Sequence, residues 1–248
     1  MHVNEQAIEI PAADGTADGF FYSPVGAGKL PGILHLTDIV GIRPANREMA
    51  KRLAASGYYV LQPNLFYRTS NPPLFDFPFN IGEERTMKRL RELSGPLTPE
   101  AMERDASAYV DFLATQPSVT TGGMGVVGYC FTGSMALRAA AARPDKIAAA
   151  ASFHGGGLCT DAANSPHTVL PRVKARLYFG HAVEDRSMPK EAIEKLERAL
   201  ASWGGSYASE TYTGASHGWT VPDSRAYNEP QAVRAFEMLA ELFSASLK

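Results

Sequence analysis

The stretch VVGYCFTGSMALRAAAA, residues 126–142, runs from an apolar segment through a cysteine into an alanine-rich segment of helical composition. Gly128 precedes Cys130 by two positions, and Gly133 follows it by three. A strand that turns sharply into a helix through such small residues lifts a nucleophile above a sheet. The start of the helix adds unpaired N–H groups and positive dipole charge, which favour a thiolate. The corner alone fits two interpretations equally: a reactive thiolate, or a small buried cysteine beside glycines that permit close packing.

Around this corner, short apolar runs alternate with longer segments of helical period. This pattern predicts an α/β fold with a mostly parallel central sheet and helices on both faces. The expected strands cover residues 19–22, 32–36, 58–63, 124–128, 148–154, 175–181 and 207–212, and a piece at 7–10 is expected to pair antiparallel at the edge. The expected helices cover residues 44–56, 99–115, 132–143, 190–203 and 229–246. Most of the strands are apolar throughout, as strands buried on both faces are.

Composition and charge argue against several classes of protein. With 248 residues, 45% of them hydrophobic, the chain can bury a sizeable core, and one domain over residues 1–248 is expected. A formal net charge of −2 gives no basic surface for nucleic acid. No apolar run approaches the ~20 residues that span a bilayer, and the N-terminus lacks a signal-peptide pattern. A cytoplasmic protein without membrane or nucleic-acid partners is therefore expected. Two cysteines and six histidines without metal-site spacing give no reason to expect a metal or another cofactor.

Two later loops carry the other groups that a cysteine nucleophile would need. RLYFGHAVEDRSMP is an expected strand followed by a loop with Glu184 and Asp185, and SETYTGASHGWTVP is another followed by a loop with His217. α/β-Hydrolases place nucleophile, acid and histidine in this chain order on loops after successive strands. An acid or a histidine alone would be an ordinary turn residue, but their joint occurrence after Cys130 favours catalysis.

The segment RTSNPPLFDFPFNIGEER, residues 68–85, interrupts the alternation with paired prolines and with Phe75, Phe77 and Phe79. Such a segment is typical of an irregular surface excursion that an aromatic cluster holds against the body of a protein. A cap-like excursion around residues 69–85 is therefore expected, in a position to cover a pocket.

At these residues the chain resembles the dienelactone hydrolase family, α/β-hydrolases with a Cys-His-Asp triad. The resemblance covers nearly the whole chain, and its specific parts are the corner GYCFTGS and the loop SHGWTVP. It implies the α/β-hydrolase fold, with Cys130 as nucleophile, His217 as the base that activates it and Asp185 as the acid that orients His217. The implied reaction is carboxymethylenebutenolidase-like hydrolysis of an ester or lactone through an acyl-enzyme on the cysteine.

The resemblance also implies two backbone donors for the oxyanion of this reaction. One is the amide of Phe131, directly after the nucleophile, and the other is the amide of Ile39, after the strand expected at 32–36. Asp38 stands where the family commonly carries a glutamate that interacts with the resting thiol, and its side chain is one methylene shorter. Asp38 is therefore either a supporting acid for Cys130 or the cap of the following turn.

A second departure from the family concerns the substrate. Members that cleave dienelactone are expected to hold its carboxylate with arginines, one of them a few residues after the histidine, where this chain has Val221. An unpaired carboxylate in a dry pocket costs several kcal/mol, so a substrate less charged than dienelactone is expected. The side chains considered as pocket walls are Tyr129, His154, Trp219, Val221, Phe75, Phe77 and Phe79.

Alternatives to an ester hydrolase stay open. One is an inactive or ligand-binding homologue on the same fold, and another keeps the thiol for thioester hydrolysis or redox sensing. A redox sensor would need Cys159 within reach of Cys130. The expected partner is a small ester or lactone substrate, and the expected state in solution is a monomer or a homodimer.

Overall fold

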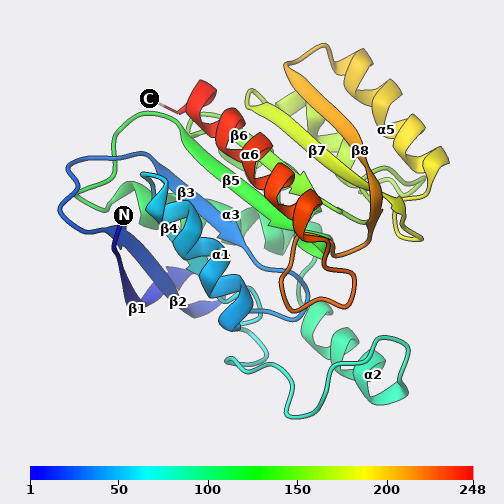
Figure 1. Ribbon diagram of the computed structural model, residues 1–248, viewed down its shortest axis with the longest axis horizontal. Helices are drawn as coiled ribbons and strands as arrows, with labels where there is room; N and C mark the ends of the chain where they lie inside the picture. Colours follow the sequence, from blue (N-terminus) through cyan, green and yellow to red (C-terminus); the bar gives the residue numbers. More distant parts are fainter. Residues whose placement is uncertain (248) are drawn as a thin grey trace.

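Eight strands form one sheet in the computed structural model, which describes residues 1–247 (Figure 1). The strands are β1 (Val3–Ala12), β2 (Gly15–Pro24), β3 (Gly32–Leu36), β4 (Tyr59–Pro63), β5 (Met124–Tyr129), β6 (Ile147–Phe153), β7 (Arg176–Glu184) and β8 (Tyr207–Ser216). Their order across the sheet is β1-β2-β4-β3-β5-β6-β7-β8. β1 pairs antiparallel with β2, and β2 with β4, whereas all other neighbours are parallel. The predicted parallel sheet with an antiparallel edge is confirmed.

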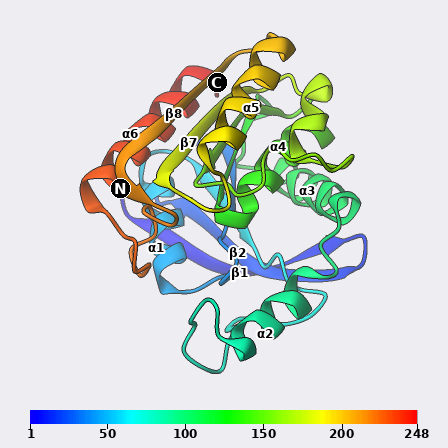
Figure 2. The ribbon, with the colours of Figure 1, turned by 90° about the vertical axis from the view of Figure 1, so that its right-hand side faces the viewer.

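Helices cover both faces of this sheet. They are α1 (Pro44–Ala55), α2 (Glu84–Ser94), α3 (Pro99–Ala114), α4 (Gly133–Ala142), α5 (Lys190–Trp203) and α6 (Glu229–Ser246), with 3₁₀ segments at Cys130–Thr132 and Pro166–Arg172. Figure 2 shows α1 and α6 on one face and α3, α4 and α5 on the other. Two hydrophobic clusters fill the two layers, one containing Leu53 and Leu239, the other Leu113 and Leu200. The α/β class predicted from the alternating pattern is confirmed.

Local chemistry explains where several helices begin and end. Pro44 and Pro99 occupy the first turns of α1 and α3, where a missing N–H costs nothing. Thr98 caps α3, because its hydroxyl accepts a hydrogen bond of 3.2 Å from the N–H of Ala101. Gly204 ends α5 in the left-handed conformation, with φ at +73°.

Helix α2 is absent from the sequence-based expectation. Only Thr86 and Leu93 are buried along its length, so the apolar signal that would reveal a helix is weak. It lies beyond the sheet at the lower side of Figure 1, at the end of the excursion. Leu93 anchors it to the core, and the guanidinium of Arg89 donates a 3.0 Å hydrogen bond to the carbonyl of Leu74.

The parallel strands determine where functional loops can meet. Every residue of β3, β4 and β5 is buried, so these strands form the rigid centre of the sheet. The carboxyl ends of parallel strands lie at one edge, and the loops after β3, β5, β7 and β8 therefore converge there. Among residues 1–247, no helix has the length and apolarity needed to cross a bilayer.

Candidate active site

The corner after β5 is a tight strand–helix turn with Cys130 at its apex. The φ angle of Cys130 is +58°, a region that residues other than glycine rarely adopt, and such strain concentrates at functional sites. A Cβ on Gly128 would lie 2.1 Å from the carbonyl oxygen of Thr132, and one on Gly133 would lie 2.2 Å from Oγ of Ser152. The glycines thus allow close packing, and Cys130 is nevertheless partly exposed rather than buried.

Three residues predicted from the sequence meet at this corner. His217 directly follows β8, and its Nε2 lies 3.0 Å from Sγ of Cys130. Asp185 directly follows β7, and its Oδ2 accepts a 2.6 Å hydrogen bond from Nδ1 of His217. Neighbouring Glu184 is exposed. The arrangement is that of a thiol, a histidine and an acid connected in series.

Ser187 is a further member of this group that sequence reasoning missed. Its N–H and hydroxyl both donate to Oδ1 of Asp185, at 2.8 Å and 2.5 Å. The Ser187 hydroxyl also lies 3.3 Å from Nδ1 of His217. An acid followed two residues later by serine is a common turn pattern, and this pattern is the sequence signal that could have pointed to Ser187. Ser187 holds one carboxylate oxygen so that the other faces His217.

The charges of this group are mutually dependent. Burial lowers the pKa of His217, but Asp185 and the sulfur of Cys130 raise it more strongly, and the pKa rises to about 10. Burial raises the pKa of Asp185, but hydrogen bonds from His217 and Ser187 outweigh it, so that pKa lies below its usual value. At neutral pH, His217 is therefore a cation between a carboxylate and the sulfur.

Phe131 and Ile39, whose amides are expected as oxyanion donors, belong to the two segments beside Cys130 that follow β5 and β3. Phe131 is the second residue of the 3₁₀ segment Cys130–Thr132, where N–H groups have no partner within the helix. Ile39 lies in the loop after β3, and its N–H donates to no backbone carbonyl among residues 1–247. Ile39 and Cys130 line the same cavity.

Arg43, which the sequence did not single out, holds the loop that carries Ile39. It donates to both carboxylate oxygens of Asp38, at 2.7 Å and 2.8 Å, and to both oxygens of Asp223 in the loop after β8. Oδ1 of Asp38 also accepts a 3.0 Å hydrogen bond from the N–H of Val40. Asp38 thus caps its turn and pairs with Arg43, and no hydrogen bond joins it to Cys130 in the part of the chain that the structure describes.

A cavity of about 530 Å³ opens beside Cys130 and His217. Its walls come from the loop after β3, from residues 79–81 of the excursion and from residues 217–218, 221 and 223–226 after β8. Arg225 belongs to this wall, and it donates a 2.6 Å hydrogen bond to Oδ1 of Asn80 across the cavity. The excursion therefore contacts the loop that carries the histidine.

The candidate wall residues divide into two groups. Phe79, His154 and Val221 line the cavity, whereas Tyr129, Trp219, Phe75 and Phe77 do not. Trp219 is fully buried against Tyr212, and Tyr129 stacks on Phe153 on the side of the sheet covered by α1 and α6. Phe75 packs behind Phe79, with ring centroids 5.2 Å apart, and Phe77 packs on Phe75. These four residues therefore lie outside the lining of the cavity at Cys130.

His154 is a neutral neighbour of His217. Its φ is +42°, its N–H donates 2.8 Å to the carbonyl of Gly180, and its Nε2 lies 2.8 Å from Oγ1 of Thr220. Burial, with a smaller effect of the His217 charge, lowers its pKa well below the ordinary value. The two imidazole centroids are 5.2 Å apart. His154 thus packs against His217 without competing for its proton.

Other candidate centres are absent from the described residues. No group of three or more His, Cys, Asp or Glu side chains with the geometry of a metal site is found among residues 1–247. Cys130 and Cys159 are both free thiols, and Cys159 is buried within a hydrophobic cluster.

A mostly parallel sheet with a tight cysteine corner after one strand, and an acid and a histidine after later strands, is the arrangement of an α/β-hydrolase. Comparison with known families assigns the chain more narrowly. The model of the dienelactone hydrolase family matches residues 17–247, so the protein belongs to that family of hydrolases.

Individual relatives agree with this assignment. A carboxymethylenebutenolidase of Rhodococcus opacus is 29% identical over 225 residues, covering 87% of this chain and 80% of the relative. A protein of Synechocystis sp., provisionally given the same enzyme name, is 26% identical over 251 residues and covers 100% and 99% of the two chains. The fold is shared with a crystal structure from Klebsiella pneumoniae, with a TM-score of 0.87, 20% identity and coverage of 98% and 99%.

Proposed function

We propose that the protein hydrolyses carboxylic esters or lactones through an acyl-enzyme on Cys130. The observation that carries this proposal is the position of His217, between Sγ of Cys130 at 3.0 Å and Oδ2 of Asp185 at 2.6 Å. This series opens into a cavity large enough for a small ester. Membership of the dienelactone hydrolase family supports the same reaction class.

In the first half of the proposed reaction, the thiolate of Cys130 attacks the substrate carbonyl carbon and an S–C bond forms. The carbonyl oxygen becomes an oxyanion, which accepts hydrogen bonds from the amides of Phe131 and Ile39. When the tetrahedral intermediate collapses, the C–O bond breaks and His217 gives its proton to the leaving alkoxide. The products are an alcohol and an acyl group on sulfur.

In the second half, the same histidine acts as a base. Acylation removes the negative charge of sulfur, and with it one cause of the high pKa of His217. The now neutral His217 accepts a proton from water as the water oxygen attacks the thioester carbon. Collapse of this intermediate releases the carboxylic acid and restores the thiolate beside the imidazolium. Asp185 keeps Nδ1 protonated throughout, which directs Nε2 toward the reacting atoms.

The cavity suggests the chemistry of the substrate. Val221 stands at the position where an arginine would hold a carboxylate, and the charge of Arg43 is already neutralised by Asp38 and Asp223. Phe79 and Ile81 add apolar surface. These features favour small uncharged esters and lactones over dienelactone. Arg225, at the cavity wall, is a cation that would favour a negatively charged substrate, but its guanidinium is already hydrogen-bonded to Asn80.

We further propose that residues 69–85 serve as a cap on a single catalytic domain. Residues 79–81 form one wall of the cavity, and the Asn80–Arg225 hydrogen bond connects this wall to the loop after β8. Exclusion of water by such a segment strengthens the electrostatic interactions on which the reaction depends.

A substrate panel with matched cysteine variants tests the proposed function. Wild type, Cys130→Ala and Cys159→Ala are assayed with uncharged aryl esters, lactones and dienelactone. We expect wild type and Cys159→Ala to hydrolyse small neutral esters, and Cys130→Ala to lose this activity. Equal turnover by all three proteins would refute the nucleophile, and no turnover by any of them would refute the substrate class.

A further inference from the structure

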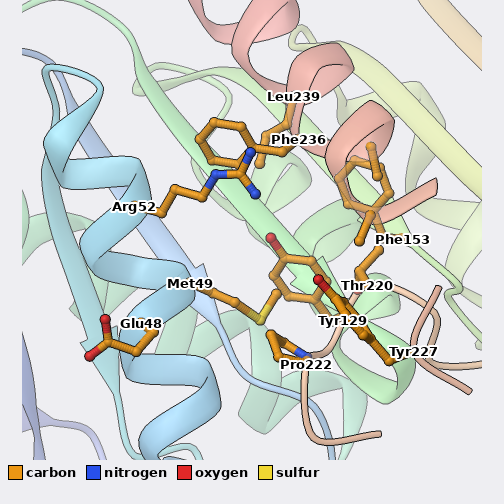
Figure 3. Close-up of a pocket in the computed structure, with 12 residues that line it drawn as sticks. Glu48, Met49, Arg52, Tyr129, Phe153, Thr220, Pro222, Tyr227, Phe236 and Leu239 are labelled. Carbon is orange, nitrogen blue, oxygen red and sulfur yellow. The ribbon is translucent and has the colours of Figure 1, made fainter. Parts of the chain in front are cut away.

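A second cavity lies between α1 and α6, against the loop that follows β8 (Figure 3). Its volume is about 150 Å³, and Tyr129 and Phe153 form its base. Apolar walls come from Met49 of α1 and Leu239 of α6, and the charged residues Glu48 and Arg52 of α1 also line the cavity. It shares no lining residue with the cavity at Cys130. Nothing in the proposed reaction uses this space.

The hydroxyl of Tyr129 is a polar group at the base of this cavity. Only 5% of the residue is exposed, and its hydroxyl is not one of the buried polar atoms without a partner among residues 1–247. Figure 3 shows the ring at the base of the cavity with the hydroxyl on the side of Arg52. A hydroxyl at the base of a cavity can donate a hydrogen bond to a bound molecule that carries an acceptor.

Arg52 supplies a positive charge at the same cavity. Its guanidinium lies 3.7 Å from the ring centroid of Phe236, and it makes no ion pair in the described part of the chain. The neighbouring cation, Lys51, is already paired, with Glu5 at 3.1 Å and with Glu48 at 2.8 Å. Stacking fixes the guanidinium plane at the edge of an apolar cavity, which suits recognition of a carboxylate.

We propose that this cavity binds a small monocarboxylate with an apolar body, such as an aryl carboxylate, and that its occupancy changes the reactivity of Cys130. The carboxylate would accept hydrogen bonds from Arg52 and Tyr129, and the apolar body would pack on Phe153 and Leu239. A cavity of about 150 Å³ accommodates one benzene-sized ring, so the size fits a single-ring ligand.

Two routes connect this cavity to the active site. Tyr129 is the residue directly before Cys130, whose strained φ of +58° depends on the local backbone. Thr220 also lines the cavity, and its Oγ1 lies 2.8 Å from Nε2 of His154, whose ring packs on His217. A ligand that shifts Tyr129 or Thr220 therefore acts on the residues that hold the thiol and its base. This inference goes beyond the proposed function, because binding does not require ester hydrolysis.

Binding is tested with benzoate as the probe, by calorimetric titration of four proteins. A ligand of this size is expected to bind wild type with a Kd on the order of 1 mM. Arg52→Gln should weaken binding by about 10-fold or more, since it removes a charge-assisted hydrogen bond. Lys51→Gln removes the same charge one residue away, outside the cavity, and should stay within about 2-fold of wild type. Arg225→Gln alters the wall of the cavity at Cys130, so it shows whether benzoate binds there. It should leave the affinity for benzoate unchanged.

The outcomes separate the two cavities. A wild type that does not bind benzoate, equal affinities in Arg52→Gln and Lys51→Gln, or loss of binding in Arg225→Gln would each overturn the site. Tyr129→Phe keeps the ring and removes only the hydroxyl, and it should weaken binding by about 2-fold to 10-fold. Unchanged affinity in Tyr129→Phe would overturn the assigned role of that hydroxyl.

The effect on Cys130 is tested without any ester substrate. The rate at which iodoacetamide alkylates Cys130 is followed by peptide mass spectrometry, with and without saturating benzoate. We expect benzoate to change this rate in wild type and in Lys51→Gln, and not in Arg52→Gln. An equal rate with and without benzoate in wild type would overturn the connection between the cavities. Because alkylation needs no turnover, failure of the proposed hydrolysis would not change this result.

Discussion

Nε2 of His217 lies 3.0 Å from Sγ of Cys130, although 87 positions of sequence separate the two residues. The parallel sheet produces this contact, because it places the residues that follow β5 and β8 at one edge. Asp185 and Cys130 together raise the pKa of His217 to about 10, against the opposing effect of burial. The pair is therefore arranged as an imidazolium facing sulfur, which is the charge state that a cysteine nucleophile needs.

Replacement of Cys130 by serine tests the importance of the thiolate. Cys130→Ser keeps the strained corner but replaces the thiol with a far weaker acid, so kcat should fall on the order of 10²-fold or more. KM should change little, because the substrate contacts remain. Steady-state kinetics on a neutral aryl ester check this, with Cys159→Ser as the matched control. A serine variant with near wild-type kcat would show that thiolate formation is unimportant.

Replacement of Asp185 by asparagine tests whether the Asp185 carboxylate keeps His217 protonated. Asp185→Asn removes the main partner that raises the pKa of His217, so the imidazolium should be lost at lower pH than in wild type. We expect kcat to fall on the order of 10²-fold or more, and alkylation of Cys130 to require higher pH. Glu184→Gln, at the exposed neighbouring position, makes the same change of charge and should leave both properties unaltered. Identical pH profiles of alkylation in Asp185→Asn and wild type would contradict this role.

Substitution at Val221 tests the source of substrate preference. Val221 lines the cavity but is only 1% exposed, so Val221→Arg must place its guanidinium in the cavity to avoid burying an unpaired charge. A charge-assisted hydrogen bond contributes roughly 1.5–3 kcal/mol, so kcat/KM for dienelactone relative to a neutral ester should rise about 10-fold to 100-fold. Val221→Met is the long uncharged control, and thermal unfolding shows whether each variant is folded. A folded arginine variant with an unchanged substrate ratio would mean that this position does not set specificity.

Buried histidines predict loss of stability in acid. Burial lowers the pKa of His35 and of His181 to about 4, from an ordinary value of 6.5 in the unfolded chain. The unfolded chain binds more protons between these values, so the stabilisation is complete above pH ~6.5 and is lost as pH falls toward ~4. Each histidine should contribute a slope of up to about 1.4 kcal/mol per pH unit in that window.

Urea unfolding between these pH limits measures the slope. Both ring nitrogens of His181 are buried without partners among residues 1–247, so His181→Phe should reduce the pH dependence without a large loss of stability. His2→Gln, at an exposed position, is the control and should leave the slope unchanged. The same slope in His181→Phe and wild type would show that His181 does not titrate in this way.

The sequence indicated the triad residues because chain order and the resemblance to the dienelactone hydrolase family pointed to the same positions. Cys130, Asp185 and His217 each stand directly after a strand, and β5 and most of β7 are recognisable as apolar runs. Ser187 and Arg43 were missed because their roles depend on the conformation of loops, where hydrogen-bond partners cannot be read from spacing.

The direction in which side chains point could also not be predicted from the sequence. Tyr129 and Trp219 stand beside catalytic positions in sequence, yet both face the layer under α1 and α6. Tyr129 ends β5, which is buried on both faces and so gives no alternation from which direction could be inferred. Trp219 lies in the loop after β8, where periodicity gives no direction either. Helix α2 was missed for a related reason, because its two buried residues give too little periodicity.

The central claim is that acyl transfer passes through Cys130, and trapping the acyl-enzyme tests it most directly. Wild type is mixed with p-nitrophenyl acetate, quenched with acid during turnover, digested and analysed by peptide mass spectrometry. We expect an acetyl group on the peptide that contains Cys130, none on the peptide that contains Cys159, and no trapped acetyl group in Cys130→Ala. Turnover in wild type with the acetyl group on another residue, or with an unmodified Cys130 at every quench time, would contradict the account.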